Sequence, residues 1–337
     1  MATTTLAPEP TKTSNFWRKF RKTGNIYLYL LPALLVMGII TFYPIGFQVW
    51  MSFTDYGLKN LRINAPLPDF VGLSNYIKIL VNDLPIQNFS FFGMLGFNLF
   101  WTAINVVVHV SLGVLIAVAL NTQGLWFKGI YRVIFILPMV IPEIIIANVW
   151  RNMFDPDYGA INQGLALVGR IFGMGPEMFH IRWIDQIDYP FPPIPLTLSF
   201  FALLITNIWL GWPFMTVVAT GALQSISKDL YEAASMDGAS GTQQFLNITV
   251  PLIRPAMVPA AVLGIIWTFN KYTLIYFLSG GGPIRKTEIL LTTAFRLVNE
   301  NRLYGVAAAF CVYIFIILLV ITLITNRITR ATESYDV

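Results

Sequence analysis

Six stretches of this chain are long and apolar enough to cross a membrane, and this feature restricts the possible folds more than any other. About 20 apolar residues in a helix span the roughly 30 Å of hydrocarbon in a bilayer. Within that layer a segment must satisfy its own backbone hydrogen bonds, which a helix does. The sequence therefore predicts an all-α polytopic membrane protein. Its six transmembrane helices are expected at about residues 26–51, 94–120, 131–151, 196–223, 256–279 and 304–325.

The composition agrees with this fold class and excludes several kinds of protein. Of the 337 residues, 56% are hydrophobic and 12% are charged, about half the charged share of a soluble domain. The single cysteine, Cys311, lies within an apolar run, which excludes a disulfide framework and a thiolate metal site. We expect no metal ligands and no catalytic residues in the chain.

A cluster of basic residues directly before the first apolar run predicts the orientation in the membrane. Basic residues flanking the first span tend to stay in the cytoplasm, and the same position argues against a nucleic-acid-binding role. With six crossings, both termini would be cytoplasmic, giving a basic tail at 1–25, a transmembrane domain at 26–330 and a second tail at 331–337. The cluster consists of Lys12, Arg18, Lys19, Arg21 and Lys22.

A polar segment at 224–255 interrupts the apolar pattern between the fourth and fifth predicted spans. Ser227 is a good N-cap, and Asp229 places a negative charge in the first turn, where it suits the helix dipole. A short helix is therefore expected over 228–236. Gly238 follows Asp237 and favours the left-handed conformation that ends a helix.

A second short helix is expected to follow directly in the same segment. Ser240 and Gln243 have the spacing of a capping box. Pro251 and Pro255 then predict the end of this helix and the approach to the next span. The segment thus reads as a hairpin of two short helices on the cytoplasmic side, rather than as a slack loop.

The spacing within this hairpin resembles the EAA loop of ATP-binding-cassette (ABC) importer permeases. The sequence has Glu-Ala-Ala, a gap of three, a glycine, a gap of nine and then Ile-Thr-Val-Pro, where Val250 replaces the usual leucine. In that family the loop is the coupling helix that docks into the ATP-hydrolysing subunit. The resemblance assigns ATPase coupling to Glu232, Ala233, Ala234, Ser235, Met236, Asp237, Gly238 and Ala239.

Further stretches resemble the carbohydrate-uptake branch of these permeases, the maltose and glycerol-phosphate type. They are FVGLSNY at 70–76, LPMVIPEIIIANVWRNMFDPDYGAINQGL at 137–165 and WTFNKYTLIYFLSGGGP at 267–283, so the resemblance covers about 26–330. Two positions depart from the branch. Thr242 stands where an aromatic residue is usual, and Asn-Lys-Tyr-Thr at 270–273 replaces Asn-Asp-Phe-Asp, which places a cation where acids are common.

The resemblance implies a type I ABC importer fold and a binding-protein-dependent sugar importer in the bacterial cytoplasmic (inner) membrane. Its expected partners are a second permease subunit in a heterodimer, two ATPase subunits, an extracytoplasmic solute-binding protein and the lipid bilayer, but no nucleic acid. The chain has no Gly-Lys pair and hence no phosphate-binding loop. ATP and Mg²⁺ are therefore expected on the partner ATPases, with no cofactor here. The loop Gly280, Gly281, Gly282 and Pro283 is expected to contact the binding protein.

Polar and aromatic side chains within the spans are the candidates for the substrate pathway. Such groups are expensive in hydrocarbon and tend to face the bundle interior or an aqueous cavity. Sugars are bound by stacking on aromatic faces and by amide hydrogen bonds, although the same residues also serve as contacts between helices. The candidates are Asn105, Asn207, Trp212, Trp267, Asn270 and Lys271. His109 is expected to be a packed, hydrogen-bonded histidine, and Lys271 either reaches the external interface or pairs with Glu143.

Three other functions remain as alternatives. A permease for amino acids or peptides would share the hairpin, but the GGGP and DYGAIN stretches argue against it. A secondary transporter or channel would show a paired repeat and coupling acids; the chain shows no repeat, and Glu143 is the one clear intramembrane acid. An intramembrane enzyme would need paired catalytic groups, which are not apparent among two histidines and few acids.

Overall fold

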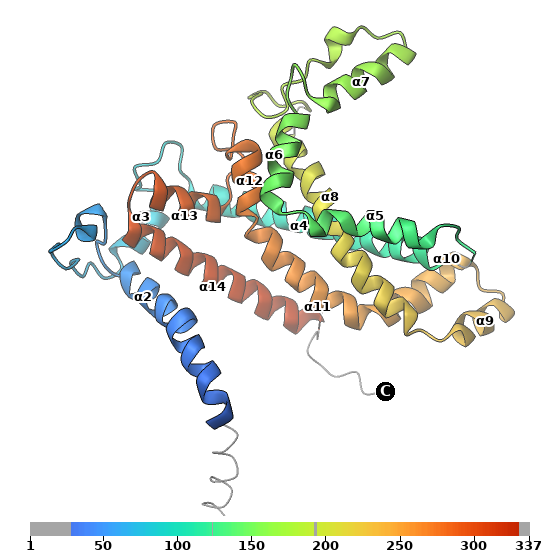
Figure 1. Cartoon of the computed structure of the whole chain (residues 1–337), viewed down its shortest axis with the longest axis horizontal. Helices are drawn as coiled ribbons and strands as arrows, with labels where there is room; N and C mark the ends of the chain where they lie inside the picture. Colours follow the sequence, from blue (N-terminus) through green and yellow to red (C-terminus); the bar gives the residue numbers. More distant parts are fainter. Residues whose placement is uncertain (1–27, 123, 192–193, 330–337) are drawn as a thin grey trace, which may run out of the picture.

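The computed structural model describes residues 28–122, 124–191 and 194–329 (Figure 1), and within these ranges all regular elements are helices. An isolated bridge between Thr54 and Phe70 is the one β-type pairing there. The basic cluster at 12–22 and the tails proposed at 1–25 and 331–337 lie outside the described residues. The helical fold class predicted from the apolar runs is confirmed.

Among the described residues, five continuous helices are long and apolar enough to span a bilayer, and a bent helix pair supplies a sixth crossing if it counts as one span. The first consists of helical residues from Leu28, a π-turn (Gly38–Phe42) and α2 (Tyr43–Ser52). Four of the six predicted spans thus match one continuous helix each. The five helices are Leu28–Ser52, Phe91–Asn121 (α4), Leu198–Gln224 (α8), Gly241–Phe269 and Tyr304–Arg327 within α14 (Tyr304–Thr329).

The span expected at 131–151 is not one helix. It consists of α5 (Lys128–Val140) and α6 (Glu143–Met153), which meet at a bend of 97°. Ile141 and Pro142 have extended ψ angles of 131° and 132°. The cause is Pro142, which has no N–H to donate and disfavours the helical conformation of the residue before it.

The span expected at 256–279 is also broken, and it begins earlier. α11 (Val250–Phe269) ends at Asn270, and α12 (Tyr272–Ser279) starts after Lys271. The predicted stop at Pro251 and Pro255 is wrong: α10 (Gly241–Gln244) runs through a π-turn (Phe245–Thr249) directly into α11. Pro251 directly follows the π-turn, where the Val250 N–H donates to the Phe245 carbonyl five residues back, and this widened turn accommodates the proline within a continuous helix.

The remaining helices are short and lie between the spans. The segment 52–93 holds a 3₁₀ turn and α3, and the segment 152–195 holds α7 and a second 3₁₀ turn. In the hairpin α9 precedes α10, and the last connection holds α13. Their bounds are Leu58–Leu61 (η2), Ser74–Leu80 (α3), Ala160–Ile171 (α7), Pro176–Phe179 (η3), Lys228–Met236 (α9) and Leu290–Asn299 (α13). The hairpin of α9 and α10 lies at one end of the long helices, and α3 and α13 lie toward the other, while α7 projects outward (Figure 1).

The packing of α4 against α8 forms the centre of the bundle. Gly113 of α4 lies so close to α8 that a Cβ there would come within 2.4 Å of the Met215 Cβ. Gly211 of α8 in turn leaves room for the His109 ring, since its Cβ would lie 2.1 Å from that ring. Small residues that allow helices to approach closely are the usual basis of packing in membranes, where the hydrophobic effect adds little.

The Asn98 side chain on α4 links the α4–α8 pair to the end of α11 and to the start of α13. Its side-chain amide donates to the Phe269 carbonyl at the end of α11 (3.2 Å), and its Oδ1 accepts from the Leu290 N–H at the start of α13 (3.0 Å). Both backbone groups belong to helix ends, which lack partners of their own. A fully buried amide therefore fixes where α11 ends and α13 begins.

Candidate functional site

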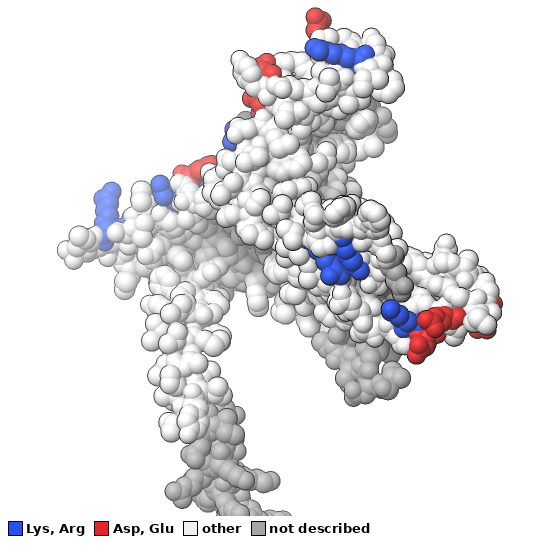
Figure 2. Space-filling model, turned by 45° about the vertical axis from the view of Figure 1, so that its right-hand side comes forward, with Lys and Arg blue, Asp and Glu red and all other residues white. Residues whose placement is uncertain are grey.

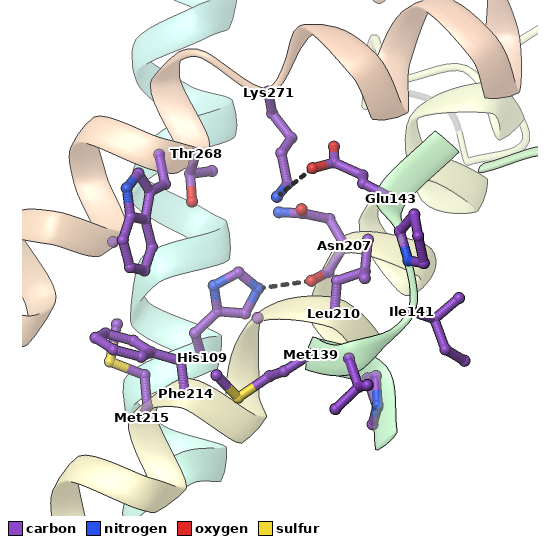
Figure 3. A pocket seen from close by; sticks show the side chains of 16 residues that line it. His109, Met139, Ile141, Glu143, Asn207, Leu210, Phe214, Met215, Thr268 and Lys271 are labelled. Atoms are coloured by element: carbon purple, nitrogen blue, oxygen red, sulfur yellow. Dashed lines mark hydrogen bonds and ion pairs between the residues drawn. The ribbon is translucent and has the colours of Figure 1, made fainter. Parts of the chain in front are cut away.

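A pocket of about 390 Å³ opens where the two helix breaks face each other (Figure 3). The break between α5 and α6 forms one wall, the end of α11 forms another, and α4 and α8 close the remaining sides. Broken helices are tolerated in a membrane where the irregular backbone lines a cavity. The lining residues are His109, Pro138, Met139, Val140, Ile141, Pro142, Glu143, Asn207, Leu210, Gly211, Phe214, Met215, Gly264, Trp267, Thr268 and Lys271.

An ion pair joins the two breaks across this pocket. The Lys271 Nζ lies 3.3 Å from the Glu143 Oε2. The other carboxylate oxygen of Glu143 accepts the Leu274 N–H at 3.1 Å, in the first turn of α12. A negative charge at that position satisfies a free N–H group and suits the helix dipole. Of the two readings of Lys271 from the sequence, pairing with Glu143 is therefore confirmed.

A polar chain between α4 and α8 reaches the pocket through His109 and Asn207, which line it. The His109 Nε2 lies 2.9 Å from the Asn207 carbonyl oxygen. The side-chain amide of Asn207 donates to the Asn105 Oδ1 at 2.7 Å, and the Asn105 amide donates to the Trp101 carbonyl. The expectation of a packed, hydrogen-bonded His109 is confirmed. The buried Oδ1 of Asn207 makes no hydrogen bond within the described structure, which leaves one acceptor unused at this wall.

The structure brings together half of the predicted pathway residues. Asn207, Trp267 and Lys271 line the pocket. The other three are not among the residues that line it. Asn105 is buried between α4 and α8 behind Asn207, Trp212 packs edge-on against Phe135, and Asn270 donates to the Ile266 carbonyl of its own helix.

The pathway candidates inferred from the sequence do not include the residues around the break between α5 and α6, which form one wall of the pocket. The sequence signal that could have identified this wall is the pair Pro138 and Pro142, which interrupts an apolar run directly before the acidic residue Glu143. Proline-interrupted apolar segments often lie at the binding site of a transporter. Thr268 was missed because a single threonine in an apolar run has no distinguishing feature. The tertiary structure alone shows that its helix ends beside the pocket.

A double-mutant cycle measures the ion pair across the pocket. Glu143→Ala and Lys271→Ala should each lower the free energy of unfolding by about 1–3 kcal/mol, because each leaves a partly buried charge without its partner. The double variant should lose less than the sum of the two. Thermal unfolding in detergent provides the measurement, with the exposed Glu177→Ala as control. Additive losses would mean that the two groups do not interact.

The hairpin predicted at 224–255 forms as two capped helices. The Ser227 side chain accepts from the Asp229 N–H, and Ser240 and Gln243 make the reciprocal contacts of a capping box. Gly238 adopts a φ of +79°. The Gly238 N–H donates to the Ser235 carbonyl and the Ala239 N–H to the Ala234 carbonyl, which is the Schellman arrangement of a glycine C-cap.

The residues assigned to coupling form the tip of this hairpin. Glu232, Ala233, Ser235, Asp237 and Gly238 are exposed, and the Met236 side chain is 88% exposed; Ala234 and Ala239 are half-buried. Two contacts hold the helices together: Tyr231 Oη to Thr249 Oγ1 at 2.9 Å, and the Gln244 amide to the Ser235 Oγ at 2.9 Å. The hairpin thus presents a fixed, exposed end to a partner.

The glycine-rich loop lies toward the other end of the spans, over a buried ion cluster. The Glu288 side chain is fully buried, with Arg296 Nε at 2.7 Å, Arg285 Nη1 at 3.8 Å and the Thr293 hydroxyl donating to it at 3.0 Å. Burial raises the pKa of the Glu288 carboxyl, against the opposing effect of the two guanidinium groups. A Cβ on Gly281 would lie 2.3 Å from the Glu288 Cγ, so the loop closes over the carboxylate.

Residues 109–334 match the family described as "Binding-protein-dependent transport system inner membrane component". Similar proteins include the galactooligosaccharides transport system permease protein GanP of Bacillus subtilis (strain 168), 31% identical over 92% of this chain and 71% of that protein. The trehalose/maltose transport system permease protein MalF of Thermococcus litoralis is 32% identical, over 93% of this chain and 96% of that one. The maltodextrin transport system permease protein MalC of Streptococcus pneumoniae is 30% identical over 98% and 75%.

Solved structures share the fold. A chain of a bacterial ABC transporter involved in the import of the acidic polysaccharide alginate superposes with a TM-score of 0.74, covering 94% of this chain and 98% of that one at 20% identity. A second structure, of such a transporter in complex with an alginate pentasaccharide-bound periplasmic protein, gives 0.72 over 95% and 99%. The likeness in fold therefore extends over nearly the whole chain.

Proposed function

Because the chain belongs to the family of binding-protein-dependent transport system inner membrane components, we propose that it is one permease subunit of an ATP-driven sugar importer. The observation that carries this proposal is its similarity, over more than nine tenths of its length, to three permeases named for oligosaccharide or disaccharide transport. The domain that performs this role is the segment 26–330, in the bacterial inner membrane with both termini in the cytoplasm.

The pocket between the helix breaks supplies the chemistry for part of a sugar pathway. Trp267 offers an aromatic face and Thr268 contributes a hydroxyl group, while the buried amide of Asn207 lies in the wall behind them. Aromatic faces and amides are the groups that bind sugars in exchange for water. The opposite charges of Glu143 and Lys271 neutralise each other at this wall, which favours an uncharged di- or oligosaccharide or polyol glycoside.

The exposed hairpin tip fits a docking role toward a separate ATPase. Its two short helices are held by caps and by side-chain contacts rather than by burial. Two ATPase subunits that bind ATP and Mg²⁺ would engage two such hairpins, one from this chain and one from a second permease subunit. A solute-binding protein would deliver the sugar at the opposite side, where the loop Gly280–Pro283 lies. Closure of the ATPases would then move the spans through α9 and α10.

Stimulation of ATPase activity in the assembled complex tests this function. The complex, reconstituted with its binding protein, is given a panel of neutral di- and oligosaccharides, polyol glycosides, an acidic oligosaccharide, amino acids and peptides. At least one neutral sugar should stimulate ATP hydrolysis several-fold. Stimulation by an amino acid or peptide with no response to any carbohydrate would contradict the proposal.

A further inference from the structure

Two cations at the start of α5 have no partner in the described part of the chain. Lys128 and Arg132 lie one helical turn apart, and both side chains are half-buried. Within the described residues neither makes an ion pair or a side-chain hydrogen bond. Removing a charge from water is costly unless an anion compensates it. The two positions therefore call for an anion from outside the chain.

Each of the two cations lines a hollow, and the two hollows adjoin. Lys128 lines a cavity of about 840 Å³, together with Lys228 and Glu232 of the hairpin. Arg132 lines a smaller one of about 200 Å³, whose other walls are mainly apolar: Leu120, Phe135, Ile136, Pro213, Thr216, Val217, Thr220 and Gln224. Gln224 borders both. Two cations and one carboxylate thus line the larger hollow, and the third cation, Arg132, lines the apolar hollow that borders it at Gln224.

Both hollows lie beside the ends of two membrane-spanning helices, α4 and α8. α4 ends at Asn121 and α8 ends at Gln224. Between α4 and α5, Trp126 and Phe127 are 81% and 67% exposed. Aromatic side chains are enriched where the hydrocarbon meets the lipid headgroups. Figure 2 shows Lys and Arg side chains in two neighbouring patches on this face, the lower one next to acidic side chains.

We propose that this place binds an anionic phospholipid. Lys128, Arg132 and Lys228 hold the phosphate and its headgroup, and the apolar hollow beside Arg132 receives the upper part of an acyl chain. A free phosphate or nucleotide would use the cations but would leave the apolar hollow and the exposed aromatic pair without a role. The lipid would lie against the root of the hairpin, since Lys228 is the first residue of α9.

Lipid retention by the assembled transporter tests this site. The full complex is reconstituted in nanodiscs of dioleoyl phosphatidylcholine with dioleoyl phosphatidylglycerol, extracted into detergent and analysed by native mass spectrometry. The variant Lys128→Gln/Arg132→Gln should retain phosphatidylglycerol roughly tenfold less than the parent, because each basic residue near a membrane surface adds to the attraction of anionic lipid. Retention of phosphatidylcholine should not change.

A matched variant controls for net charge. Arg170→Gln/Arg254→Gln removes two cations from α7 and α11, outside both hollows, and should retain phosphatidylglycerol like the parent. Lys228→Gln changes an exposed residue and should lose part of the phosphatidylglycerol retention. This variant replaces Lys128→Gln/Arg132→Gln in the test if that double substitution disturbs assembly of the complex. Added glycerol phosphate should not displace the lipid.

Four results would overturn the proposal. The first is equal retention by the parent and by both site variants. The second is an equal loss in the control pair, which would mean attraction by overall charge only. The third is displacement by glycerol phosphate, which would mean a site for a soluble phosphate compound. Dissociation of the complex with unchanged lipid retention would also overturn it, because the cations would then pair with a subunit.

Discussion

The Gly238→Pro variant should reach the membrane in normal amounts, retain its transmembrane helices and lose transport. Proline cannot adopt the φ of +79° that Gly238 has in the hairpin turn, because its ring fixes φ near −65°. It also removes the N–H that donates to the Ser235 carbonyl. The turn must rearrange, and the tip that carries Glu232 and Met236 moves from its docking position. A docking loss of about 1.4 kcal/mol already lowers association tenfold, so transport should fall at least that far.

Two further variants show whether the disrupted turn causes the loss of transport. Gly238→Asn should keep most of the activity, since asparagine tolerates the left-handed conformation. Gly241→Ala, in the first turn of α10, has open space around its Cβ and an ordinary φ, so it should behave like the parent. Uptake of the sugar, co-purification of the ATPase and sugar-stimulated ATP hydrolysis are the measurements. Normal uptake by Gly238→Pro would count heavily against a docking role for the hairpin.

The Glu288→Gln variant should be the least stable of the single substitutions considered. It removes the charge that faces Arg296 at 2.7 Å and Arg285 at 3.8 Å in a fully buried position. Removing one partner of a buried pair costs about 3–5 kcal/mol, and Arg296 would keep only the half-exposed Glu300 and a backbone carbonyl as partners. The loop Gly280–Pro283 should loosen as well, because Arg296 also donates to the Gly280 carbonyl. Thermal unfolding of the purified complex measures the loss.

The matched control is Glu300→Gln, which removes the exposed partner of the same arginine. Arg296 Nη1 also pairs with Glu300 at 2.7 Å, but the Glu300 side chain is 45% exposed. An exposed ion pair contributes about 0–1 kcal/mol, so Glu300→Gln should change stability little. Equal losses in the two variants would show that burial does not strengthen the Glu288 contact. If Glu288→Gln also weakens capture of the solute-binding protein while Glu300→Gln does not, the loop has the contact role proposed for it.

The local features of the hairpin could be predicted from the sequence because they depend on neighbours only. A serine cap, a capping box and a glycine stop act within a single turn, and the structure has all three at Ser227, Ser240 and Gly238. The stop expected at Pro251 failed for a related reason. Pro251 directly follows the π-turn at 245–249, and this widened turn accommodates a residue without an N–H, so the helix continues past it.

The pocket could be predicted only in part. Asn105 and Asn207 look alike in the sequence, each an amide within an apolar run, but one is buried between two helices and the other lines the cavity. Which face of a helix points into a cavity depends on its neighbours. The prolines at 138 and 142 predict an interruption of the helix. The size of the bend, 97°, depends on the packing of α6 against α12, which the sequence does not show.

Patterns in the sequence were enough to identify a helical membrane protein, the positions of its main apolar helices and the segment between them that forms a capped hairpin. Hydropathy over 20 residues and capping over four are short-range properties, so they can be read along the chain. The tertiary structure decided the rest: that Glu143 and Lys271 join across two helix breaks, that Asn98 fixes two helix ends and that Glu288 is buried beneath a glycine loop. The two members of each contact lie more than 100 residues apart, as with Glu143 and Lys271 or with Asn98 and its partners. What each contact contributes to stability depends on its burial, which exists only once the helices have packed.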